Sequence, residues 1–141
     1  MSKDKKITVN PYLTFSGNCR EAIMFYKEAL DGEIELMTFE GSPVDVPENY
    51  KDMILHASLT IGNAIIMASD AMPNEEIVLG NAYNISISTP DAEKGEHFFK
   101  NLSAGGSIVM PFGDAFWDAK FGMLIDKFGI HWMINCQKEQ K

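Results

Sequence analysis

The spacing of hydrophobic residues in the first half of the chain predicts one helix among four strands. After Asn18, apolar residues recur every three or four positions, as on a helix with one buried face. Asn18 followed three residues later by Glu21 indicates a capping box at the helix start, and Asp31-Gly32 indicates its end. The flanking segments are short apolar or alternating runs, which are typical of strands. The predicted strands are 12–15, 34–39, 53–61 and 64–69.

The second half of the chain repeats this order of elements. Thr89-Pro90 indicates a helix start, with threonine as the cap and proline at the first helical position. Gly105-Gly106 indicates the end of this helix. The predicted strands are 83–88, 107–112, 121–125 and 130–135, and residues 72–80 are expected to link the two halves.

The two halves also match residue by residue at a shift of 73 positions. The matching pairs are Phe25 and Phe98, Tyr26 and Phe99, Lys27 and Lys100, Gly32 and Gly105, Met37 and Met110, and Phe39 and Phe112. Such an internal repeat predicts two β-α-β-β-β modules, about 10–70 and 81–136, within a single domain of residues 1–141. We expect an α+β fold in which the modules form one curved eight-stranded mixed sheet with helices outside. Its concave face is a natural place for a small-molecule pocket.

Composition and charge narrow the classes of partner. A net charge of −8 argues against binding a nucleic-acid backbone. No apolar run approaches the roughly 18 residues of a membrane span, so no membrane partner is expected. Cys19 and Cys136 form no CxxC motif, so neither a disulfide nor a zinc site is indicated. We therefore expect a reduced, cytoplasmic protein.

Three stretches carry a resemblance to a known family. They are PYLTFSGNCREAIMFY at 11–26, MASDAMP at 67–73, and FW through FGMLIDKFGIHWMIN at 116–135. In them the chain resembles the PhnB-like branch of the glyoxalase/bleomycin-resistance group, within the vicinal oxygen chelate superfamily. The resemblance implies the paired-module fold, a homodimer and a pocket that faces small molecules. Some members carry a ubiquinone-methyltransferase label, but this chain lacks the glycine-rich loop after a first strand that a nucleotide-like cofactor requires.

The resemblance also implies where a metal would bind. Metal-dependent members of the superfamily use four inward side chains, typically His and Glu, from the first and last strand of each module. The corresponding positions here hold Tyr12, Ile66 or Met67, Asn84 and Met133. A phenol, an amide and thioethers are poor ligands for hard divalent ions. We expect no cofactor and no metal at these positions, although a rebuilt divalent site stays open.

The histidines offer a second kind of chemistry. His56 and His131 are either a metal-binding or acid–base pair, or two isolated residues that are each hydrogen-bonded in place. His97 is expected on the surface of the second helix. Ser69-Asp70 offers a hydroxyl and a carboxylate at a pocket mouth, or simply forms a turn.

The aromatic residues near the C-terminus suggest a ligand surface. By strand alternation, Trp132 packs under a helix if Met133 lines the pocket. Phe116, Trp117 and Phe121 are expected to close the pocket or to pack against a partner subunit. The nine methionines fit either an adaptable ligand surface or core filler.

These observations support two functions. The first is binding of a small organic molecule in an aromatic pocket without the usual metal. The alternative is a metal- or histidine-dependent lyase or isomerase that acts on a carbonyl substrate, with His56 as the candidate catalytic base. The expected ligand-binding residues are Tyr12, His56, Asn84, Phe116, Trp117, Phe121, His131 and Met133.

Overall fold

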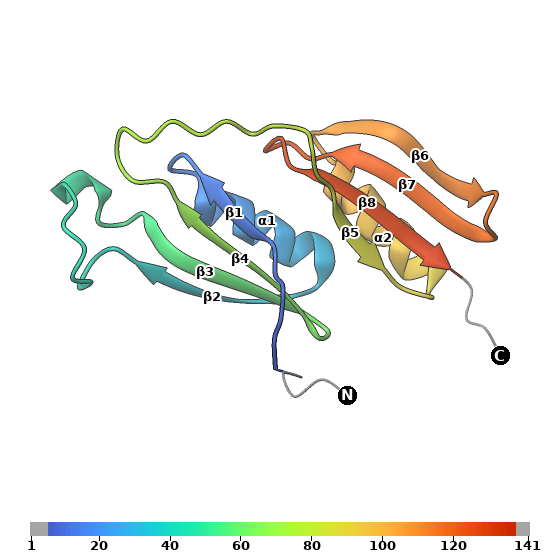
Figure 1. Cartoon of the computed structure of the whole chain (residues 1–141), viewed down its shortest axis with the longest axis horizontal. Coiled ribbons are helices and arrows are strands. Elements are labelled where there is room, and N and C mark those ends of the chain that lie inside the picture. Colours follow the sequence, from blue (N-terminus) through green and yellow to red (C-terminus); the bar gives the residue numbers. More distant parts are fainter. Residues whose placement is uncertain (1–5, 138–141) are drawn as a thin grey trace. The chain divides into compact units, whose positions relative to one another are not determined.

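A computed structural model describes residues 6–137 (Figure 1). The chain divides into two compact units, residues 1–77 and 78–141, and each is a β-α-β-β-β module. In the described part of the chain, no helix is long and apolar enough to cross a membrane.

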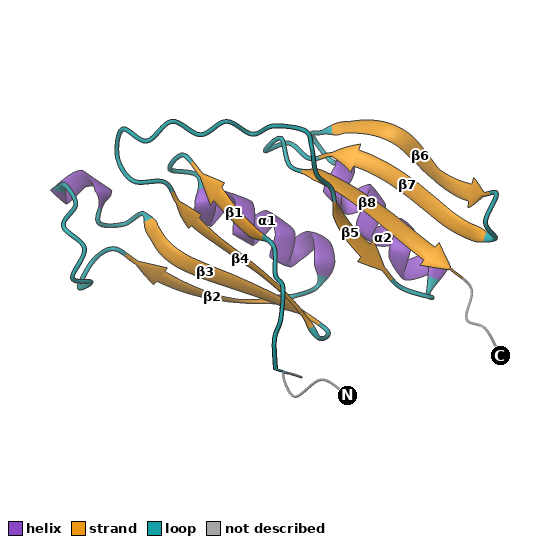
Figure 2. Ribbon diagram, in the orientation of Figure 1, coloured by secondary structure: helices purple, strands orange, loops and turns teal. Residues whose placement is uncertain are grey.

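The first module contains an α-helix, a short 3-10 helix and a four-stranded mixed sheet (Figure 2). Its elements are β1 (Tyr12–Phe15), α1 (Cys19–Leu30), β2 (Glu33–Thr38), the short 3-10 helix η1 (Glu48–Tyr50), β3 (Ile54–Ile61) and β4 (Ala64–Asp70). The strand order is β1-β4-β3-β2. β1 runs parallel to β4, and the other neighbours are antiparallel. α1 packs against one face of this sheet.

The second module repeats this arrangement. Its elements are β5 (Ile85–Ser88), α2 (Ala92–Ser103), β6 (Ser107–Ala115), β7 (Ala119–Ile125) and β8 (His131–Gln137). The strand order is β5-β8-β7-β6, with β5 parallel to β8 and the remaining pairs antiparallel. The α+β class and the two predicted modules are confirmed, and hydrogen bonding organises the eight strands as two four-stranded sheets.

Side-chain alternation gives each sheet one buried face. On β4, Ile66 and Ala68 are buried beneath α1, while Met67 between them points to the opposite face. On β8, Trp132 and Ile134 are fully buried beneath α2. Burial of these apolar side chains supplies most of the driving force that holds each helix on its sheet.

The first helix starts after Asn18, as predicted, but its cap differs from the prediction, and the second helix start needs correction. The Asn18 side chain makes no capping hydrogen bond, and the Asp70 carboxylate accepts from the Cys19 amide instead. The second helix begins later than predicted, because Asp91 is its cap and accepts from the Lys94 amide. The repeat itself is exact in this region, since the bounds of α1 and α2 are offset by the same 73 positions.

Candidate functional site

Each sheet has a face opposite its own helix, which we call the helix-free face. Strand alternation and strand pairing determine which side chains lie together on each helix-free face. The first helix-free face carries Tyr12, Thr14, Glu35, Met37, His56, Ser58, Met67 and Ser69. The second carries Ser86, Ser88, Phe121, Met123, Ile125, His131, Met133 and Asn135.

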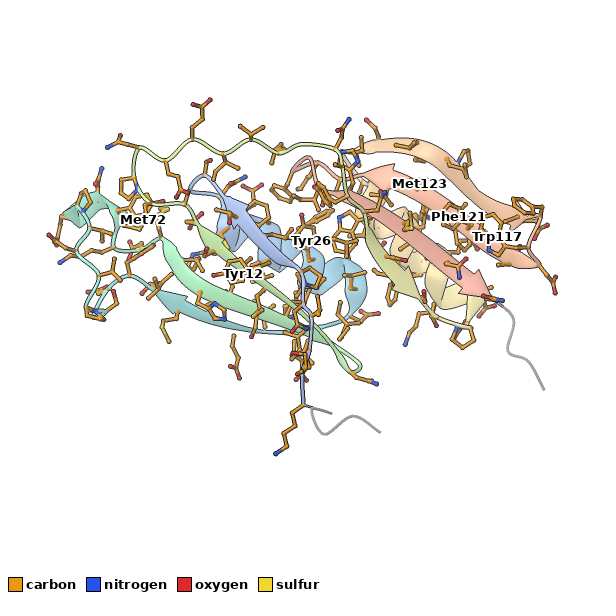
Figure 3. The ribbon with its side chains drawn as sticks, viewed as in Figure 1. Tyr12, Tyr26, Met72, Trp117, Phe121 and Met123 are labelled. Carbon is orange, nitrogen blue, oxygen red and sulfur yellow. The ribbon has the colours of Figure 1, made fainter. Side chains whose placement is uncertain are left out.

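An aromatic cluster stands at the β6–β7 end of the second helix-free face (Figure 3). The Trp117 indole Nε1 donates to Asn135 Oδ1 at 3.2 Å. Its ring lies edge-to-face with Phe121 at 5.3 Å and with Phe116 at 4.9 Å between centroids. Trp117 is 40% exposed and Phe116 is 96% exposed. The structure thus brings the three predicted aromatic residues together and leaves two of them accessible.

The turn that carries this cluster is set by backbone conformation. Asp118 adopts a left-handed φ of 61°, which lets the chain reverse between β6 and β7. The reversal turns Trp117 back toward Asn135 on β8, two strands from β6. The indole is therefore held by a hydrogen bond and a ring contact, although Trp117 as a residue is 40% exposed.

Strand β8 presents two of the predicted site residues to the same face. His131 and Met133 are half-buried and alternate with the buried Trp132, as expected. The His131 amide donates to the Tyr83 hydroxyl at 3.2 Å, and the two rings lie 5.3 Å apart. The His131 ring thus packs against the Tyr83 ring, while the hydrogen bond between the two residues involves the backbone amide of His131.

The first helix-free face brings Tyr12 and His56 together. Tyr12 Oη lies 3.4 Å from His56 Nδ1, and Tyr12 is 48% exposed. A bulge lies between the pairs Met37–His56 and Thr38–Ile54. Because of this bulge Ile54 is buried while His56 is half-buried on the helix-free face.

The remaining predicted residues lie outside these clusters. Asn84 is exposed and directly precedes β5, which begins at Ile85 and not at residue 83. His97 is exposed on α2, as predicted, and its Nε2 lies 3.1 Å from Asn101 Nδ2.

The donor set at the four implied metal positions does not fit a hard divalent ion. Pairing with Tyr12 shows that Met67, and not the buried Ile66, faces the helix-free side. The positions therefore offer a phenol, two thioethers and an amide, none of them a carboxylate or imidazole. Among residues 6–137 there is no group of three or more His, Cys, Asp or Glu side chains that could hold a metal ion.

Two buried carboxylates turn out to be structural. Asp70 is 5% exposed and accepts from the amides of Cys19 and Ile54 at 2.9 and 2.8 Å. It therefore lies beneath the sheet and not at a pocket mouth, whereas Ser69 lies on the helix-free face. Asp126 is 3% exposed and accepts from the indole Nε1 of Trp132 at 2.8 Å.

Two hollows lie on the helix side of the second module. One, of about 170 Å³, lies near the start of α2 and includes Lys120 and Cys136 in its lining. The other is an open groove of about 740 Å³ between α2 and β6, lined by His97, Ile108 and Phe112 among others. Neither contains a residue that the sequence predicted as ligand-binding.

The two cysteines are free, buried and poorly suited to chemistry. Burial, and then the Asp70 carboxylate, raise the pKa of the Cys19 thiol from 9.0 to about 12. Burial, and then the Asp91 charge, raise the pKa of the Cys136 thiol. Because the thiolate is the reactive form, neither residue is an activated nucleophile.

The raised Cys19 pKa predicts a loss of stability at alkaline pH. The unfolded chain releases this proton first, so the stabilisation is complete below about pH 9 and is lost as the pH rises toward about 12. Urea unfolding at neutral and alkaline pH should show a steeper decline for the wild type than for Cys19→Ala. Equal declines in the two proteins would contradict this effect.

Comparisons with known proteins identify the family. A family model described as 3-demethylubiquinone-9 3-methyltransferase matches residues 5–135. Protein YjdN of Escherichia coli is 36% identical over 143 residues, covering 94% of this chain and 97% of that protein. The crystal structure of protein PA1353 from Pseudomonas aeruginosa is 40% identical, with a TM-score of 0.85 over 94% of this chain and 99% of that one.

More distant structures place the fold in its superfamily. A Bacillus cereus PhnB protein, described as a putative 3-demethylubiquinone-9 3-methyltransferase, is 27% identical with a TM-score of 0.73, covering 91% of this chain and 98% of that one. The fosfomycin resistance protein FosX from Listeria monocytogenes, solved with Mn(II) and a dihydroxypropylphosphonic acid, has a TM-score of 0.64 at 8% identity, covering 93% of this chain and 92% of that one. It shares the fold alone. This chain belongs to the PhnB-like family that bears the 3-demethylubiquinone-9 3-methyltransferase description, and it has the glyoxalase-like fold of the vicinal oxygen chelate superfamily.

Proposed function

We propose that this protein binds a small organic molecule on the second helix-free face, without the divalent metal of metal-dependent relatives. One observation carries the proposal: the Trp117 indole is fixed by Asn135 and Phe121 and is still 40% exposed. An aromatic ring that is already fixed before binding lowers the entropic cost of binding, because binding does not have to order that side chain. An indole held in this way, beside a methionine-rich surface, suits an apolar or aromatic ligand.

The polar groups of the same face would orient such a ligand. Ser86 and Ser88 are exposed along β5, and Ser86 pairs with Met133. The side chains named above for this face include no carboxylate, ammonium or guanidinium group, so binding would depend on apolar contact and a few hydrogen bonds. Methyl transfer is not part of the proposal, because the turn between β1 and α1 contains a single glycine, Gly17.

The proposal includes an assembly and a location. Phe116 is 96% exposed, and burial against a second copy of the chain in a homodimer would remove this apolar side chain from water. A net charge of −8 argues against nucleic acid as a partner, and no membrane partner is proposed. Two free cysteines suit the reducing cytoplasm.

The test is a ligand screen followed by tryptophan fluorescence. The chain has two tryptophans, and Trp132 is fully buried, so a change in emission on binding should come from Trp117. Trp117→Phe should abolish the spectral response. Trp117→Ala should weaken binding by about tenfold or more, the equivalent of about 1.4 kcal/mol or more.

A matched control separates this site from the rest of the surface. Tyr83→Phe keeps the ring beside His131 and removes only the hydroxyl that accepts from its amide, so binding should change little. If ligands bind and Trp117→Ala binds them as tightly as the wild type, the proposed location is wrong.

The Tyr12–His56 contact favours a second candidate function. An imidazole next to a phenol can remove a proton beside a carbonyl group, as a lyase or isomerase requires. The Tyr12 hydroxyl, 3.4 Å from His56 Nδ1, would orient the ring or donate to the developing oxyanion.

Deuterium exchange tests this second function directly. Carbonyl compounds in heavy water would be followed by NMR for exchange at the carbon next to the carbonyl. His56→Gln should abolish catalysed exchange, and Tyr12→Phe should reduce it and alter its pH profile. Exchange that is equally fast with His56→Gln would eliminate His56 as the base.

A further inference from the structure

Three methionines lie in register across neighbouring strands of the second helix-free face. Met110 on β6 pairs with Met123 on β7, and Met123 pairs with Met133 on β8. From this methionine row, we propose a binding site for a soft monovalent cation such as Cu⁺ or Ag⁺. This site goes beyond the proposed binding of an organic molecule.

Two irregularities in β6 bring Met110 into the row. Ile108 pairs with Leu124, which is buried beneath α2, so Ile108 lies on the helix side. The register shifts between Ile108 and Met110, and Met110 therefore pairs with Met123 on the other face. In a regular strand, residues 108 and 110 would share a face.

A second register shift lies between Met110 and Gly113. Within it, the side chain of Phe112 points to the helix side, where its ring lies near Gly95 of α2, and Gly113 then pairs with Phe121. β6 thus departs twice from regular pairing, once on each side of Met110. The result is a thioether aligned with the two on β7 and β8.

The spacing of the row permits a shared ligand. Directly paired residues of adjacent strands have Cβ atoms about 4.5–5.5 Å apart. Methionine has three flexible side-chain bonds, so sulfur atoms on three adjacent strands can converge on one ion. Met110 is 48% exposed, and Met123 and Met133 are half-buried, which leaves a path for the ion.

The chemistry of the row selects the class of ion. Neutral thioethers are soft donors and select Cu⁺-like ions over hard divalent ions. Phe121 and Ile125 flank Met123 on the same face and would shield the bound ion from water. The donor type that makes Met133 unsuitable for a divalent metal therefore makes it suitable for a soft cation.

Methyl NMR with silver nitrate tests the site. Protein carrying ¹³C-methyl methionine would be titrated with Ag⁺, which resembles Cu⁺ but resists oxidation. The methyl signals of Met110, Met123 and Met133 should shift together and saturate at one ion per chain. Met123→Leu, which keeps the side chain apolar and similar in size, should weaken Ag⁺ binding by about tenfold or more.

Two controls make the outcome decisive. Met24→Leu replaces an exposed methionine on α1 and should leave Ag⁺ binding unchanged. A Cys19→Ala/Cys136→Ala variant removes the thiols as competing ligands, and should still bind one ion. The proposal is overturned if the three methyl signals do not shift together. It is also overturned if Met110→Leu/Met123→Leu/Met133→Leu binds Ag⁺ as well as the wild type, or if the variant without thiols no longer binds Ag⁺. Organic-ligand binding is measured separately, so the two proposals can fail independently.

Discussion

Replacing Asp126 with alanine is expected to lower the free energy of unfolding by about 4 kcal/mol, because two buried donors and one partly buried donor lose their acceptor, at about 1–3 kcal/mol for each buried one. The carboxylate accepts from the amides of Phe128 and Ile130 at 2.8 and 3.1 Å. It also accepts from the Trp132 indole at 2.8 Å. Urea unfolding should show a large fall in the midpoint, and Trp132 fluorescence should respond because its indole loses this acceptor.

The effect should spread to the proposed ligand site. Asp126 fixes the turn from which β8 starts, and β8 carries Met133 and Asn135 into the helix-free face. Asp114→Ala is a matched control, since its carboxylate is 90% exposed and pairs only with Lys120 among the ion pairs described. The control should change stability by about 0.5 kcal/mol or less. Equal losses in the two variants would refute the structural role of Asp126.

Replacing Asp70 with alanine is expected to cost about 3 kcal/mol, since two buried amides lose a charged acceptor. The carboxylate joins the start of α1, at Cys19, to the start of β3, at Ile54. The loss should therefore loosen the strand that carries His56. Circular dichroism and urea unfolding would measure the loss of helix and of stability.

An exposed aspartate of the same module provides the comparison. Asp45 is exposed in the loop between β2 and η1. Asp45→Ala should therefore leave the unfolding midpoint nearly unchanged. Asp70→Asn should fall between wild type and alanine, because an amide retains one acceptor oxygen and loses the charge. If Asp70→Ala unfolds at the same midpoint as Asp45→Ala, the hydrogen bonds to α1 and β3 contribute nothing measurable.

Periodicity and the internal repeat were enough to predict the eight strands, the two α-helices and the module order, but not the short helix η1. The buried stripe of each helix and the alternation around Trp132 depend on local spacing, which the sequence displays directly. The pairing of Met37 with His56 and of Met110 with Met123 agrees with the repeat, because both methionines face the helix-free side. Family membership follows from the same stretches that carry the resemblance.

Tertiary hydrogen bonds and bulges could not be predicted from local sequence patterns. Asp70 follows a strand, and nothing nearby in the sequence shows that its partners lie 51 and 16 positions away. The bulges beside His56 and Met110 change which side chains share a face, and they depend on the neighbouring strand. The in-register methionines could have been suspected only if the strand pairing had been known.

Binding of an organic ligand to metal-free protein tests the central claim most directly. Protein made without a metal-affinity tag would be treated with a chelator, checked by elemental analysis, and titrated by calorimetry with a ligand found in the screen. We predict that the ligand binds with the same affinity before and after manganese, nickel or zinc is added. Binding that appears only with one divalent ion per chain would contradict the account.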